Sequence, residues 1–308
     1  MEKHISVLLN EAIDYLNIKE DGNYIDATLG YAGHSKEILK RIPEGFLLAF
    51  DKDIDAIKYS DEVLSKVGNN YKIVNTGFIN IKDVVLEENF KVNGVLFDLG
   101  ISSPEIDEGE RGFSYMKDAT LDMRMDQDAK LSAYDVVNTY SLEDLVRIFR
   151  KYGEEKHARS IANEIVSVRL NKKISTTFEL VDIIDRCYPY KEKRNTHPAK
   201  KVFQALRIEV NNELGEFEKA LTDCLELLEV GSRIVVITFH SLEDKICKNI
   251  FREYTQVDEV VKGMPNIPDE FKPRFKLVTN KPIVPSFDEI SSNKRSKSAK
   301  MRVIEKIR

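Results

Sequence analysis

The fold is decided by Tyr24-Ile25-Asp26-Ala27-Thr28-Leu29-Gly30-Tyr31-Ala32-Gly33-His34-Ser35. A short apolar run ends at Asp26, a glycine-bearing turn follows, and a helical pattern begins at Ser35. This order predicts a strand, a tight turn and a helix start, because glycine permits sharp turns and the first amides of a helix have no partner within it. The spacing is not G-x-G-x-x-G. The turn alone therefore fits either a nucleotide-like ligand or any first strand-to-helix turn of a doubly wound sheet.

Two further apolar runs end in an acid, at Asp51 and at Asp98. With a short strand at 71–75 and helical patterns between the runs, they predict a parallel sheet whose carboxyl edge carries Asp26, Asp51 and Asp98. Ligands bind at that edge. Acids without a phosphate-binding lysine fit an adenosine with a cationic tail, which is S-adenosylmethionine, better than NAD or ATP.

The strand pattern stops after residue 98, and residues 132–190 read as helices, with caps at Ser141 and Thr176. Strand-like sequence resumes at 233–239, where Ser241 is expected to cap the next helix. We therefore predict an α/β protein with a discontinuous sheet domain (residues 1–110 and 212–308) and an inserted helical domain (residues 111–211). A long helix from 197 is expected to kink at Gly215, and residues 275–278 to form an edge strand.

Composition indicates an ordinary globular protein: 308 residues with 42% hydrophobic content supply a core. The sequence shows neither a run of 18 apolar residues nor a signal-type N-terminus, so we expect a cytoplasmic protein that does not use a membrane. Cys187, Cys224 and Cys247 lie far apart, which predicts buried thiols and neither a disulfide framework nor a metal site.

Charge is unevenly distributed along a chain whose net charge is −5. That balance disfavours nonspecific coating of nucleic acid. Two basic groups stand out, namely residues 294–308 (Lys294, Arg295, Lys297, Lys300, Arg302, Lys306 and Arg308) and residues 191–201 (Lys191, Lys193, Arg194, Lys200 and Lys201). Each group is either a solvated face or a local phosphate-binding surface.

Several blocks, taken in order, resemble the MraW/RsmH family across nearly the whole chain. They are residues 4–10, 26–35, 98–104, 110–114, 121–125, 197–214, 239–244 and 293–302. The resemblance implies a Rossmann-like class I methyltransferase that depends on S-adenosylmethionine. It also implies methylation of the N4 amine of a cytidine in the decoding region of bacterial 16S rRNA, with the small ribosomal subunit as partner.

The resemblance also assigns cofactor-binding residues. Ala32, Gly33 and His34 match the cofactor turn, which also contains Asp26 and Gly30; the other assigned residues are Asp51 for the ribose, Phe78 beside the adenine, and Asp98. The family's usual Gln is Glu105 here. A carboxylate accepts hydrogen bonds but cannot donate them, and its charge could pair with the sulfonium instead.

The expected chemistry is methylation of a weakly nucleophilic exocyclic amine. Acceptors must hold and aim that amine, so positioning does most of the catalytic work. The predicted catalytic group is Asp98 with the turn Ser102, Ser103 and Pro104. Phe113 and Tyr115 are candidates for stacking on a base turned out of the RNA. His34 and His240 are either helix caps or catalytic groups.

The predicted RNA-binding residues are Lys193, Arg194, Lys200, Lys201, Arg207, Lys294, Arg295 and Lys297. Arg207 could equally be ion-paired. Two other functions remain open from the residues alone. One is methylation of DNA or a small amine, and the other is a ribosome assembly factor with a vestigial pocket.

Overall fold

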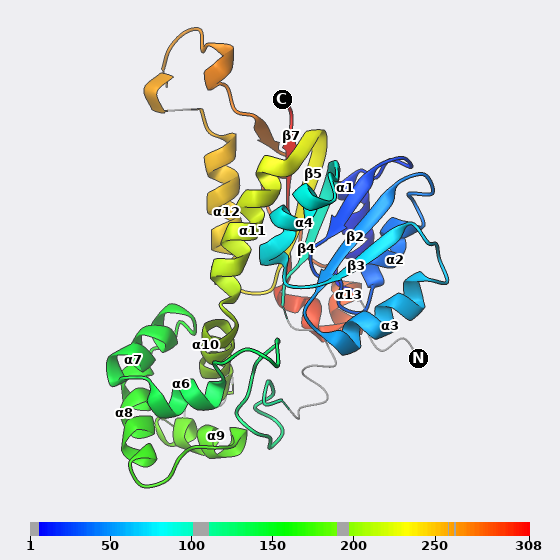
Figure 1. Ribbon diagram of the computed structural model, residues 1–308. Helices are drawn as coiled ribbons and strands as arrows, with labels where there is room; N and C mark the ends of the chain where they lie inside the picture. The colour runs from blue at the N-terminus through cyan, green and yellow to red at the C-terminus, as the bar shows by residue number, and fades with distance from the viewer. Residues whose placement is uncertain (1–5, 101–110, 190–196, 258, 262) are drawn as a thin grey trace. The chain divides into compact units, whose positions relative to one another are not determined.

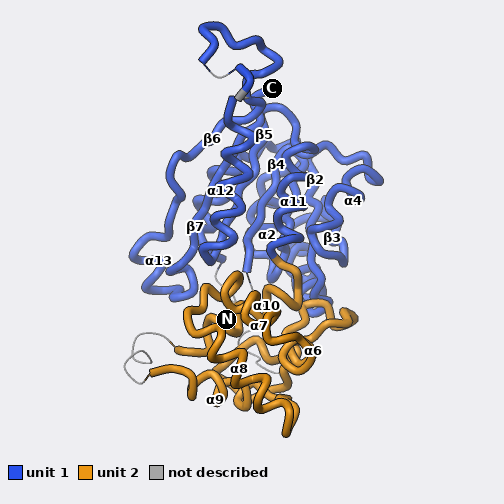
Figure 2. Tube along the Cα trace, turned by 90° about the vertical axis from the view of Figure 1, so that its left-hand side faces the viewer, with its two compact units in different colours: residues 1–100, 214–308 blue, residues 101–213 orange. Residues whose placement is uncertain are grey.

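The structure is a computed structural model that describes residues 6–100, 111–189, 197–257, 259–261 and 263–308. The chain forms two compact units. Unit 1 holds Met1–Gly100 and Leu214–Arg308, and unit 2 holds Ile101–Glu213 (Figure 2). The sequence predicts an insert of residues 111–211, whereas unit 2 spans residues 101–213.

A seven-stranded sheet forms the centre of unit 1, with the strand order β3-β2-β1-β4-β5-β7-β6 (Figure 1). β1 to β5 pair in parallel, whereas β7 runs antiparallel to both β5 and β6. The strands are β1 (Asn23–Asp26), β2 (Phe46–Asp51), β3 (Tyr71–Asn75), β4 (Val92–Asp98), β5 (Leu228–Thr238), β6 (Phe275–Leu277) and β7 (Lys300–Lys306). Asp26, Asp51 and Asp98 each end a parallel strand, so they share one edge of the sheet.

Helices cover both faces of this sheet because neighbouring strand residues point to opposite sides. Leu47 and Ala49 join one core, and Leu48 and Phe50 join the other. The first core includes residues of α1 (Leu9–Leu16), α2 (Gly33–Leu39) and α3 (Ile54–Leu64); the second includes residues of α4 (Ile81–Glu87), α11 (Glu213–Leu227) and α12 (Ser241–Thr255). This is the doubly wound α/β arrangement that the sequence predicts.

Unit 2 has its own apolar core, formed by residues between 113 and 210. Its helices are α6 (Ala133–Thr139), α7 (Leu142–Lys151), α8 (Ala158–Arg169), α9 (Thr177–Arg186) and α10 (Ala199–Asn211). The predicted caps of α7 and α9 are confirmed: Ser141 accepts a hydrogen bond from the amide of Asp144, and Thr176 forms a capping box with Glu179.

Three local predictions are wrong. The basic tail forms β7, in which Met301, Val303 and Ile304 are buried. The long helix breaks at Asn212, whose φ of 48° is left-handed, and not at Gly215. The cap of α12 is His240, one residue before the predicted Ser241, because the imidazole can accept from the amide of Glu243.

Candidate active site

The turn after β1 is held by hydrogen bonds that its amides donate to β2. The amide of Gly30 donates to Oδ2 of Asp51 at 2.8 Å, and the amide of Leu29 donates to the carbonyl of Phe50 at 2.9 Å. Gly30 and Ala32 adopt left-handed φ values of 48° and 61°. A Cβ on Gly33 would lie 1.8 Å from Oγ of Ser6. The absence of a Cβ at Gly33 thus lets the Ser6 side chain approach the turn, and a larger residue would require Ser6 to move.

Asp51 is fixed in orientation at the end of β2. Its Oδ1 accepts from the amide of Asp53 at 2.9 Å, while its Oδ2 holds the turn. The next residue, Lys52, forms an ion pair with Glu216 at 2.7 Å, and its side chain lies where a Cβ on Gly77 would be. The following segment, η1 (Phe78–Asn80), thus starts beside the Lys52 side chain.

Phe78 is half-buried, and its ring packs edge-to-face on Phe97 with centroids 6.0 Å apart. The core therefore fixes one part of the Phe78 ring. Its remaining exposed part could contact a planar group, as expected for the residue beside the adenine.

Asp98 meets His34 at the carboxyl edge of the sheet. Nδ1 of His34 lies 3.4 Å from Oδ2 of Asp98, and the amide of Asp98 donates to Oγ1 of Thr28 at 2.7 Å. Oδ1 of Asp98 is buried and accepts no hydrogen bond from the part of the chain that the structure describes. This oxygen is the unsatisfied acceptor of the edge.

Asp26 and Glu243 surround Asp98 with further negative charge. Burial raises the pKa of the Asp98 carboxyl well above its ordinary value, and the charges of Asp26 and Glu243 raise that pKa further. Asp26 is 1% exposed, and its oxygens accept from the amide of Thr28 and the hydroxyl of Ser35. Burial also raises the pKa of Asp26, although these two bonds oppose the shift. A bound cation would relieve this repulsion.

Comparison with known proteins gives the family. Residues 1–307 match the MraW methylase family. The chain belongs to that family. It is 52% identical to the ribosomal RNA small subunit methyltransferase H of Streptococcus mutans, over 99% of this chain and 98% of that protein.

Two solved structures also resemble the chain, although weakly. An rRNA methylase from Streptococcus thermophilus has a TM-score of 0.46 and 12% identity, with 99% of each chain covered. A Streptococcus mutans methyltransferase in complex with SAH has a TM-score of 0.44 and 14% identity, with 99% of this chain and 100% of that one covered. Neither similarity is close enough to assign a role to a residue.

Family membership confirms the resemblance drawn from the sequence. The fold is that of a Rossmann-like class I methyltransferase, and S-adenosylmethionine is the cofactor of this MraW methylase. The carboxyl edge fits that cofactor: Oδ1 of Asp98 accepts no hydrogen bond from the described residues, and Asp98 together with the buried Asp26 and Glu243 favours a cationic sulfonium.

Sequence reasoning missed Glu243. This residue is 3% exposed, and its Oε2 accepts from the amides of Phe239 and His240 at 2.7 and 3.2 Å. Nδ1 of His240 accepts in turn from the amide of Glu243. The spacing of an acid three residues after a cap could have identified Glu243, since it is that of a capping box. The cap alternative for His240 is the one observed.

Several other predicted site residues either lie outside the described residues or belong to unit 2. Ser102, Ser103, Pro104, Glu105, Lys193 and Arg194 lie outside the described residues. In unit 2, Phe113 is only 6% exposed and belongs to the core. Tyr115 is half-buried and stacks on the exposed His197 with centroids 4.5 Å apart, so it remains a stacking candidate.

The basic residues divide into paired and exposed groups. Nε and Nη2 of Arg207 donate to the carboxylate of Glu213, at 2.8 and 2.9 Å, so the ion-paired alternative for Arg207 is the one observed. Arg302 and Lys300 pair with Asp244 at 2.7 and 3.2 Å. Side chains that are exposed to solvent are Lys200, Lys201, Lys294, Arg295 and Lys297.

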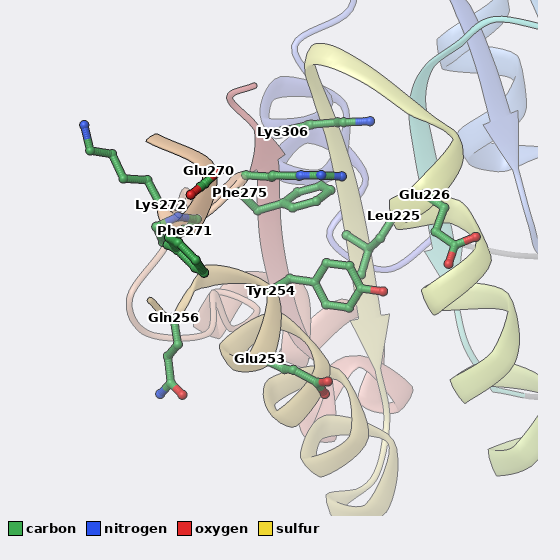
Figure 3. Close-up of a pocket in the computed structure, with 12 residues that line it drawn as sticks. Leu225, Glu226, Glu253, Tyr254, Gln256, Glu270, Phe271, Lys272, Phe275 and Lys306 are labelled. Carbon is green, nitrogen blue, oxygen red and sulfur yellow. The ribbon is translucent and has the colours of Figure 1, made fainter. Parts of the chain in front are cut away.

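A cavity of about 570 Å³ is lined by residues of α11, α12, β6 and β7 (Figure 3), and none of Asp26, Asp51, Asp98 or Glu243 is among its lining residues. Its lining includes Phe275, which begins β6, and Lys306, which ends the antiparallel β7, so it belongs to the amino edge of the sheet. Across the described residues there is no cluster of three metal-ligating side chains, and no helix long and apolar enough to cross a bilayer.

Proposed function

We propose that this protein transfers the methyl group of S-adenosylmethionine to the N4 amine of a cytidine in the decoding region of 16S rRNA, on the assembled small ribosomal subunit. The support is family membership, together with the name of the Streptococcus mutans relative. An rRNA substrate would place this activity in the cytoplasm. A protein with a net charge of −5 suits local recognition on a preassembled particle better than binding along naked RNA.

The observation that carries the chemistry is that Oδ1 of Asp98 accepts no hydrogen bond from any described residue. The cofactor supplies an electrophilic methyl group on a cationic sulfur. Asp98 accepts a hydrogen bond from the target amine and so orients its nitrogen toward that methyl group. When the nitrogen bonds to the methyl carbon, the methyl–sulfur bond would break, its electron pair would leave with S-adenosylhomocysteine, and the amine would carry one proton too many. A carboxylate whose pKa is raised by burial and by neighbouring acids is suited to take that proton.

The remaining residues have positioning roles in this proposal. Asp51 binds the ribose hydroxyls, Phe78 contacts the adenine, and the Ala32-Gly33-His34 turn supports the rest of the cofactor. Ser102, Ser103 and Pro104 supply further contacts to the base, and Glu105, in addition to Asp98, offers negative charge to the sulfonium. Unit 2 recognises the substrate through Lys200 and Lys201, with Lys193 and Arg194.

The test is transfer of labelled methyl groups from S-adenosylmethionine to purified small subunits, naked 16S rRNA and duplex DNA in parallel. The labelled product is digested to nucleosides and identified. We expect N4-methylated cytidine from small subunits and much less from naked rRNA. Label on DNA alone, or on another atom of rRNA, would contradict the proposal.

A further inference from the structure

We infer that Phe287 and the cations of η4 (Lys294–Ser298) form a contact for single-stranded RNA, in which the Phe287 ring stacks on an unpaired base and Lys294, Arg295 and Lys297 bind the phosphates beside it. This inference rests on the proposed function, because it names the form of RNA that the site receives. Phe287 begins α13 (Phe287–Ser292), and η4 follows that helix directly.

The position of η4 follows from strand pairing. β7 begins at Lys300, which pairs with Thr238 at the end of β5, and Oγ1 of Thr238 donates to the carbonyl of Lys300 at 3.2 Å. Residues just before Lys300 therefore lie at the carboxyl edge of the sheet, where Asp51 and Asp98 end their strands. Figure 1 shows α13 at this end of the sheet, below the strands in that view.

The segment is anchored at several points, so Phe287 is presented from a fixed backbone. Oε1 of Glu289 accepts from the amide of Leu8 at 2.8 Å. Ile283 and Met301 exchange two backbone hydrogen bonds, at 2.9 and 2.8 Å. Ser296 is fully buried within η4 and donates to the carbonyl of Asn293 at 2.8 Å. A fixed backbone reduces the entropy that a bound strand must overcome.

The exposed side chains of this segment include an aromatic ring and three cations, with one exposed acid, Asp288, next to the ring. Phe287 is 82% exposed and the nearby Val284 is 59% exposed. Lys294 and Lys297 are exposed and form no ion pair within the described residues. Lys300 and Arg302 differ, since Asp244 pairs with both. Lys294 and Lys297 thus have no carboxylate partner among the described residues, whereas Lys300 and Arg302 stabilise β7 through their pairs with Asp244.

An exposed apolar residue alone needs no explanation. The combination of an aromatic ring with cations is the pattern that binds single strands, because every unpaired base offers a face for stacking and every nucleotide a phosphate. In a duplex the base faces are stacked on one another, so a protein that binds a duplex needs cations for the phosphates but no exposed aromatic ring. A substrate base that has been turned out of its helix leaves unpaired neighbours next to the site.

The test compares Phe287→Ala, Phe287→Leu and Phe287→Tyr for equilibrium binding to small subunits, to a single-stranded RNA and to duplex RNA. We expect Phe287→Ala and Phe287→Leu to lose about tenfold in affinity for subunits and single strands, and Phe287→Tyr to bind as wild type. Duplex binding should not change. Leu86→Ala, which alters another exposed apolar residue of unit 1, is the matched control and should bind as wild type.

Several results would overturn the inference. If Phe287→Ala binds RNA with wild-type affinity, no base stacks on the ring. The same conclusion follows if Phe287→Leu binds with wild-type affinity while Phe287→Ala does not, because an aliphatic side chain then suffices. A change in oligomeric state in the Phe287→Ala variant would assign the ring to a protein contact. Failure of wild-type protein to bind any of the RNA probes would also refute it. If wild type binds RNA through Phe287 but makes no N4-methylated cytidine, the proposed function fails and this contact stands.

Discussion

Nδ1 of His34 lies 3.4 Å from Oδ2 of Asp98, which joins the turn after β1 to the end of β4. The imidazole sits at the first turn of α2, and the carboxyl group ends a neighbouring parallel strand. Asp26 and Glu243 add negative charge to the same place. Repulsion among these carboxylates at the carboxyl edge of the sheet therefore lowers the stability of the cofactor-free protein. A cationic cofactor bound beside them offsets this repulsion.

Asp98→Asn should stabilise the cofactor-free protein at neutral pH. The folded pKa of Asp98 is raised, so ionising this group above its unfolded pKa of about 3.9 opposes folding, and an amide removes the charge. We expect the melting temperature to rise by about 2–4 °C, the shift that roughly 1 kcal/mol produces. Calorimetry without cofactor measures it, and a melting temperature well below wild type would contradict the account.

Asp244→Asn is the matched control and should act in the opposite direction. Hydrogen bonds and ion pairs with Arg302 and Lys300 lower the pKa of Asp244 despite its partial burial. Its contribution to stability is thus present above the unfolded pKa and lost as the pH falls through the lower folded pKa. Removing the charge should cost about 1–3 kcal/mol at pH 7, seen in the same calorimetric scan.

The affinity for S-adenosylmethionine should depend on pH more than the affinity for S-adenosylhomocysteine. Below its raised pKa Asp98 is protonated, and a cationic sulfonium favours the ionised form, so binding releases a proton. Affinity for the cation should rise by up to about tenfold per pH unit until Asp98 ionises, and then level off. Titration calorimetry on both ligands tests this, and identical pH profiles would count against it.

Gly33→Ala should weaken cofactor binding through Ser6. The new Cβ would lie 1.8 Å from Oγ of Ser6 and 3.1 Å from its Cβ. Overpacking of this kind costs about 1–3 kcal/mol. The Ser6→Ala/Gly33→Ala double variant removes the clashing oxygen and should recover part of the loss. If Ser6→Ala gives no recovery, the clash is not the reason for glycine at position 33.

Neutralising the three cations of η4 should weaken RNA binding. Replacing Lys294, Arg295 and Lys297 by Gln should reduce the slope of log affinity against log salt by about 2, since each single-strand phosphate contact contributes roughly 0.7. Arg302→Gln should instead destabilise the protein, because it leaves Asp244 without its closest partner. An unchanged salt slope in the triple variant would exclude these cations from the RNA contact.

Much of the fold follows from the sequence because its signals are local. Apolar runs ending in acids define β1, β2 and β4, and caps such as Ser141 and Thr176 define helix starts. The site was harder to predict. The sequence did not indicate β7, because the charged residues of this strand form ion pairs with residues far away in the chain. Arg302 pairs with Asp244, and Glu305 pairs with Arg233. Glu243 was missed for a similar reason, since only the fold brings its charge near Asp98.

We claim that Asp98 accepts a hydrogen bond from the amine that becomes methylated. The decisive measurement is the rate at which Asp98→Asn forms N4-methylated cytidine on small subunits at saturating S-adenosylmethionine. We expect kcat to fall by at least about 100-fold, because the variant cannot take the amine proton. Its affinity for S-adenosylhomocysteine should stay within about threefold of wild type, since that ligand carries no sulfonium charge for Asp98 to pair with. Methylation at the wild-type kcat would contradict the claim.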